Sequence, residues 1–120
     1  IREAPHRRAR ETMKYIRVSQ QKGIEVLETD EMPQFKPMQP STETSVKCVY
    51  RRFSDHRIAI VGDAKAPHKQ LPVVAVSPIG EPLHGDLLIL GLKKTIDWVD
   101  FAGLTDDQVM IVQNQLKVVN

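Results

Sequence analysis

The sequence of 120 residues gives room for one domain with little chain to spare. Its single cysteine excludes an internal disulfide, and no apolar stretch approaches the roughly 20 residues that a membrane-spanning helix needs. Only 5% of the residues are aromatic, so a core has to be built from Val, Ile and Leu, which favours sheet where these residues cluster in short runs.

The net charge of +2 hides an uneven distribution of charge along the chain. Residues 1–22 carry +5, residues 23–44 carry −4, residues 45–69 carry +4 and residues 70–120 carry −3. A basic block can bind a polyanion whatever the overall charge. A chain that begins at Ile1 rather than Met suggests either processing or a fragment of a longer chain, and a removed part could have been a targeting peptide.

Residues 1–22 are expected to form a helix, or a segment that becomes helical on binding. Ala9, Met13 and Ile16 recur at spacings of three and four residues, which gives a narrow apolar stripe surrounded by Arg and Lys. Gly23 stands where the cap that ends a helix is expected.

A short strand is expected at residues 24–28, followed by a proline-rich linker. Pro33, Pro37 and Pro40 lie close together in a stretch with almost no periodicity, which predicts an extended segment on a surface. The sequence therefore divides into a basic, partly helical arm with its linker at residues 1–44 and a compact domain at residues 45–120.

The domain reads as a series of short strands separated by Gly, Pro and Asp. The expected strands are residues 46–50, 56–61, 73–76, 86–92, 95–101 and 109–112, with an apolar tail at 116–119. No helix is expected here, and Asp106 and Asp107 are expected to cap the turn before the last strand. This mostly β pattern favours a small five- to six-stranded barrel.

The basic arm is the strongest indication of a binding partner. Arginine suits bidentate recognition of phosphate, and it dominates the arm. The residues expected to contact phosphate are Arg7, Arg8, Arg10, Lys14 and Arg17. A solvated tail, or the remainder of a cleaved presequence, is the alternative that the sequence leaves open.

Two further basic clusters lie in the expected domain, at the first junction between strands and in the loop after residue 61. Their members are Lys47, Arg51, Arg52, Arg57, Lys65 and Lys69. An ordinary charged turn explains any one of these residues. Three basic groups on a short chain, however, together favour a nucleic acid.

No complete catalytic or metal site stands out. The histidines His6, His56, His68 and His84 lack the spacing of zinc ligands. Cys48 has no base at a recognisable offset, so it is expected to be a small buried residue, and Trp98 is expected to anchor a core or an interface. The sequence therefore predicts neither an enzyme nor a bound metal, cofactor or small-molecule substrate.

The order of these features resembles the large-subunit ribosomal protein fourteen family. The resemblance rests on Ile58-Ala59-Ile60-Val61-Gly62-Asp63-Ala64-Lys65, on Val73–Val76, on the Gly85-Asp86 turn that leads into an apolar strand ending at Lys93-Lys94, and on residues 105–112. It covers roughly residues 46–112 and implies a β-barrel embedded in large-subunit rRNA beside other ribosomal proteins.

The expected function is therefore that of a structural, rRNA-binding component of a large ribosomal subunit. A divergent version with an added basic arm fits the mitochondrial matrix, with the cytoplasm as the alternative location, and no membrane insertion is expected. The rival hypothesis is a protein-interaction subunit without RNA, in an organellar complex or a viral coat, where the arm and linker would wrap a neighbour.

Overall fold

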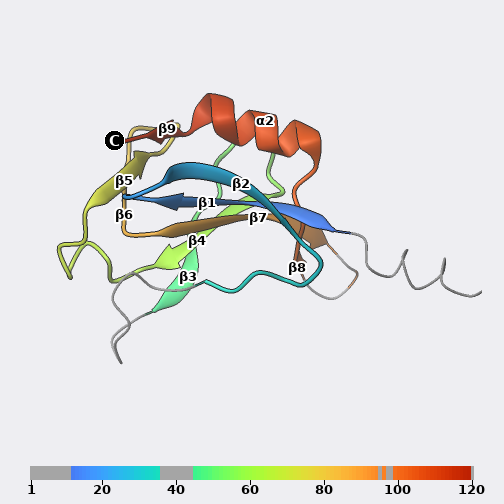
Figure 1. Ribbon diagram of the computed structural model, residues 1–120, viewed down its shortest axis with the longest axis horizontal. Helices are drawn as coiled ribbons and strands as arrows, with labels where there is room; N and C mark the ends of the chain where they lie inside the picture. The colour runs from blue at the N-terminus through green and yellow to red at the C-terminus, as the bar shows by residue number, and fades with distance from the viewer. Residues whose placement is uncertain (1–11, 36–44, 95, 97–98, 120) are drawn as a thin grey trace, which may run out of the picture.

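A computed structural model describes residues 12–35, 45–94, 96 and 99–119. This part of the chain forms two antiparallel sheets and one helix (Figure 1). The mostly β prediction is thus confirmed, but the described strands form no closed barrel.

The larger sheet, sheet A, has the strand order β2-β1-β7-β4-β3, and β8 pairs with β7 beyond the end of β1. Its strands are β1 (Met13–Ser19), β2 (Gly23–Thr29), β3 (Val46–Tyr50), β4 (Ile58–Asp63), β7 (Leu87–Lys94) and β8 (Val99–Ala102). The smaller sheet, sheet B, has the order β6-β5-β9 and comprises β5 (Val73–Val76), β6 (Pro82–His84) and β9 (Lys117–Val118). The helix is α2 (Asp106–Gln115).

The hairpin of β1 and β2 replaces the helix that was predicted at the N-terminal end. Residues 1–11 lie outside the described part, and from Met13 onward the helix prediction is wrong. Ile16 and Val18 alternate along β1 and are both fully buried, which is the pattern of a strand with one face on the core. Gly23, with φ of 65°, closes the hairpin turn instead of ending a helix.

The hairpin is part of the domain rather than an arm attached to it. β1 pairs with the central strand β7, with Ile16 opposite Ile89 and Val18 opposite Leu87. The strand predicted at residues 24–28 is confirmed as β2. The division predicted at residue 45 therefore falls between strands β2 and β3, which belong to the same sheet.

The main core lies between one face of sheet A and the layer formed by α2 and sheet B (Figure 1). Its side chains come from nearly every element and include Ile16, Ile60, Ile89, Val74 and Val112. A second, smaller cluster on the opposite face of sheet A joins Val61, Leu88 and Leu90 to Tyr15 and Phe35. Because both faces of its central strands are covered, β4 is buried along its whole length.

Helix α2 lies where the sequence predicted a short strand at residues 109–112, so that prediction is wrong. Thr105 accepts a hydrogen bond from the backbone of Gln108 (3.1 Å), and the Gln108 side chain accepts one from the backbone of Thr105 (2.9 Å). Asp106 and Asp107 occupy the first turn, where the helix dipole favours negative charge. The sequence analysis expected these two residues to cap a turn before a strand, and this expectation is wrong.

The capping box of α2 gives a direct test of this helix. Replacing Thr105 with Ala removes the side-chain acceptor, and we expect a loss of about 1 kcal/mol in the free energy of unfolding, measured in urea. Thr105→Ser keeps the acceptor and is the matched control, so its stability should stay close to that of the wild type. Equal losses in both variants would contradict the assignment of the cap.

Candidate binding groove

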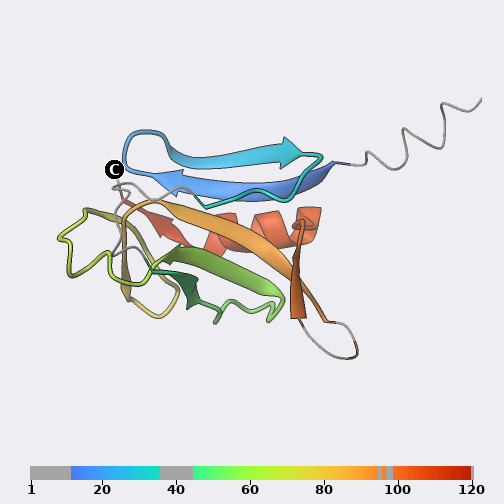
Figure 2. The same ribbon diagram turned by 90° about the horizontal axis from the view of Figure 1, so that it is seen from below.

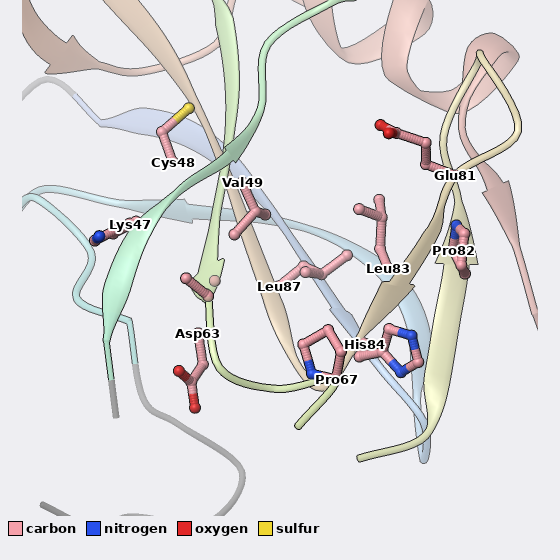
Figure 3. Close-up of a pocket in the computed structure, with 12 residues that line it drawn as sticks. Lys47, Cys48, Val49, Asp63, Pro67, Glu81, Pro82, Leu83, His84 and Leu87 are labelled. Atoms are coloured by element: carbon pink, nitrogen blue, oxygen red, sulfur yellow. The ribbon is translucent and has the colours of Figure 1, made fainter. Parts of the chain in front are cut away.

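A groove runs between β3, at one edge of sheet A, and the hairpin of β5 and β6 in sheet B (Figure 3). It consists of two adjoining hollows, of about 440 and 540 Å³, which share Cys48, Val49 and Glu81. The groove exists because β3 pairs only with β4 among the described strands, so its other edge faces sheet B without a neighbour.

The first hollow has an apolar floor and a polar rim. Val49, Leu83, Leu87 and Pro67 lie near one another in Figure 3, and the polar lining residues around them are Lys47, Asp63, Glu81 and His84. His84 Nδ1 lies 2.9 Å from the carbonyl oxygen of Leu71. Because a carbonyl oxygen only accepts, Nδ1 is the donor in this hydrogen bond.

The second hollow lies where the chain leaves β3. It is lined by Tyr50, Arg51, Arg52, Ile79 and Glu81, together with the shared Cys48 and Val49. The Tyr50 ring packs edge-on against Phe53, with ring centroids 5.2 Å apart, and its hydroxyl donates to the backbone carbonyl of Arg52 (3.1 Å). These contacts fix the turn, so both arginines stay at the end of the groove.

A buried carboxylate anchors the opposite end. Asp63 Oδ1 accepts from the backbone amides of Ser45 (3.0 Å) and Lys65 (2.9 Å), and Oδ2 accepts from Lys69 Nζ (2.7 Å). Burial alone would raise the pKa of Asp63, but the hydrogen bonds from Lys69 and the two amides outweigh it and hold the pKa below its usual value of 3.8. The carboxylate thus ties the start of β3 to the loop after β4.

The Asp63 network should make stability depend on pH in the acid range. The pKa of Asp63 is lower in the folded chain than in the unfolded chain. Its stabilising effect on the fold is therefore complete at a pH above the unfolded pKa and is lost as the pH falls through the folded pKa. We expect Asp63→Ala to cost about 3 kcal/mol at neutral pH, measured by urea unfolding. The difference from the wild type should shrink when the series is repeated below pH 3.8. A difference that stays constant with pH would mean that the carboxylate charge contributes nothing.

Four of the predicted contact residues take part in the fold. Lys14 forms an ion pair with Asp106 of α2, and Lys69 forms the buried pair with Asp63. The Arg17 guanidinium lies 5.9 Å from the centre of the Tyr15 ring. Arg57 donates from its backbone amide and Nε to Asp55 (2.8 and 3.4 Å), although its side chain is largely exposed. Arg7, Arg8 and Arg10 lie outside the described residues.

The remaining predicted residues come together around β3. Lys47, Arg51, Arg52 and Lys65 are exposed, and their side chains form no ion pair or hydrogen bond with the described residues. Lys47 and the two arginines line the groove, and Lys65 follows Ala64, whose amide donates to Ser45 at the start of β3 (2.8 Å). Four cations are thus grouped along one edge of the molecule.

Cys48 was expected to be buried, and this is wrong, because it is exposed on the edge strand. Its sulfur lies 3.6 Å from the carbonyl oxygen of Tyr50, and local burial of the sulfur raises the pKa of the thiol. A thiol protonated at neutral pH is a poor nucleophile. Trp98, which was expected to anchor a core or an interface, lies outside the described residues.

The sequence did not identify the far wall of the groove. Ile79, Glu81, Leu83 and His84 come from the β5–β6 hairpin, about thirty residues along the chain from β3. The described residues hold no group of three or more His, Cys, Asp or Glu side chains placed to bind a metal ion. None of their helices has the length and apolar character needed to cross a membrane.

Comparison of the chain with protein families, curated proteins and solved structures finds no match. The groove and its charges are therefore the basis for a functional proposal.

Proposed function

We propose that this chain is an RNA-binding structural component of a ribonucleoprotein, and specifically of a large ribosomal subunit, as the sequence resemblance implies. The observation that supports it best is the group of four exposed cations, Lys47, Arg51, Arg52 and Lys65, which no described side chain neutralises. Cations held along one edge of a rigid sheet can neutralise phosphates without the cost of ordering a flexible tail.

The contact would be made mainly with phosphate. The aromatic rings beside the groove, Tyr50 and Phe53, are 5% and 2% exposed, so neither offers a face on which a base could stack. Arg51 and Arg52 are adjacent and exposed at the end of β3, and each guanidinium can grip a phosphate with two hydrogen bonds. Such binding positions an RNA backbone and reads little sequence.

The ribosomal assignment adds neighbours and a location to this proposal. Other ribosomal proteins would cover part of the surface, and the mitochondrial matrix would be the compartment, with the cytoplasm as the alternative. The ribosomal assignment also implies a β-barrel. Sheets A and B face each other across the core, and an added strand in the groove between β3 and β6 would connect the edges of the two sheets and bring them closer to a barrel.

Binding to a structured RNA across a salt series tests this function. Arg51→Gln with Arg52→Gln should weaken binding and lower the slope of log affinity against log salt by about 2, one for each lost phosphate contact. Lys93→Gln with Lys94→Gln removes two adjacent exposed lysines at the end of β7 that do not line the groove, and it is the matched control. Equal effects of both pairs, or no steep salt dependence in the wild type, would contradict the proposal.

The basic arm gives a second, separate prediction. Arg7, Arg8 and Arg10 are replaced together by Gln in the full chain, which leaves the sheet from β1 onward intact. If the arm contacts phosphate as expected, the same slope should fall by up to about 3. An unchanged slope would restrict the RNA-binding surface to the edge of β3.

A protein-interaction subunit is the second candidate, and the groove is the observation that favours it. An apolar floor between Val49 and Leu83, with Ile79 53% exposed at one end, fits side chains better than phosphates. A chain bound here would be held by the backbone of β3 as well as by these contacts.

A further inference from the structure

Among the described strands, sheet A has an open edge at each end. Figure 2 shows β2 at one end of the sheet and β3 at the other, with β1, β7 and β4 between them. Within the described part of the chain, β2 pairs only with β1, and β3 pairs only with β4. Each outer edge therefore presents backbone groups that a further strand can bind.

The two edges carry opposite charge. Along β2 and the residues that follow it lie Glu25, Glu28, Asp30 and Glu31. Along β3 and the residues that follow it lie Lys47, Arg51 and Arg52. Apart from the half-buried Glu25, all of these residues are exposed. Charged residues on edge strands usually prevent pairing between identical edges, but an acidic edge and a basic edge attract each other.

The direction of the strands also matches the charges. Four antiparallel pairings separate β2 from β3, so the two strands run the same way within the sheet. If a second copy extends the sheet with the same face turned toward the core side, its β2 strand lies beside β3 of the first copy and runs parallel to it. In the register that places the C-terminal ends of the two strands side by side, Asp30 and Glu31 of one copy lie beside Arg51 and Arg52 of the next.

The groove leaves room for such a strand. The two hollows beside β3 have the volume of several side chains, and Val49 and Leu83 form their apolar floor. Apolar residues are also exposed on both edges, with Val26 on β2 at 41% and Val46 on β3 at 51%. An added strand would cover these side chains and satisfy the free backbone groups of β3 together.

We propose that copies of this chain associate head to tail, with the acidic β2 edge of one copy paired to the basic β3 edge of the next. This inference goes beyond the RNA-binding function and does not depend on it. Because the two contacting surfaces differ, the association does not stop at a dimer: it continues until a ring closes or a filament forms.

The full chain tests the proposal directly. Sedimentation velocity at rising protein concentration should show species larger than a dimer at low salt, and these should dissociate as salt is added. Asp30→Lys with Glu31→Lys leaves basic residues after both edge strands, and Arg51→Glu with Arg52→Glu leaves acidic residues after both. Each variant alone should remain monomeric, whereas an equimolar mixture should associate again, because each acidic edge then meets a basic one.

Lys93→Glu with Lys94→Glu makes the same charge change away from both edges and should associate like the wild type. Circular dichroism and thermal melting confirm that each variant is folded. Should a reversal unfold the chain, Asp30→Asn with Glu31→Gln replaces it and should weaken association without changing the fold. A wild type that stays monomeric at every concentration would overturn the proposal, as would a mixture that fails to associate.

Two further outcomes would also overturn head-to-tail pairing. If either charge-reversed variant still forms dimers alone, identical edges are pairing with each other. If the wild type stays monomeric but binds a synthetic peptide of residues 23–31, the groove takes an acidic strand from a different protein. RNA binding by the Asp30→Lys, Glu31→Lys variant is measured in parallel: it retains Arg51 and Arg52, so loss of self-association with RNA binding intact separates the two functions.

Discussion

The position of strand β7 determines the rest of the structure. It pairs with β4 along one edge and with β1 and then β8 along the other. Leu88 and Leu90 face one apolar cluster while Leu87 and Ile89 face the other, so β7 can only lie inside the sheet. The backbone at Gly103 can lie close to β7 because residue 91 is a glycine. A Cβ on Gly91 would lie 2.7 Å from the carbonyl oxygen of Gly103. With β7 at the centre, β2 and β3 are left as the edges.

The sequence identified most strands because β-branched residues in short runs seldom fit anything else, and β3, β5 and β7 lie close to their predicted ranges. It failed where one pattern fits two structures. Met13 and Ile16 have helical spacing, but Ile16 and Val18 also alternate, and pairing with β7 selects the strand. Four apolar residues from Val109 read equally well as a strand, and the capping box at Thr105 decides for a helix.

The candidate site could be predicted only in part. Exposed cations can be recognised from composition, since a basic residue without an acidic neighbour in sequence usually stays in solvent. That reasoning fails for Lys69 and Lys14, because their partners Asp63 and Asp106 are brought near by the fold. The groove itself lies between residues about thirty positions apart, and no local pattern indicates that β3 and β6 will face each other across a gap.

RNA and the β2 strand of a neighbouring copy would compete for Arg51 and Arg52, and the two kinds of binding would differ in how strongly they depend on salt. Phosphate binding at Arg51 and Arg52, as proposed, would be almost entirely electrostatic and would weaken steeply with salt. The proposed pairing of β2 with β3 would depend on the same charges, but also on backbone hydrogen bonds and on burial of the exposed Val26 and Val46, which salt does not screen. Free protein should therefore exchange one partner for the other as ionic strength and RNA concentration change. A protein that associates with itself until RNA takes up its basic edge would deliver single copies to an assembling particle, which reconciles self-association with a structural role in a ribonucleoprotein.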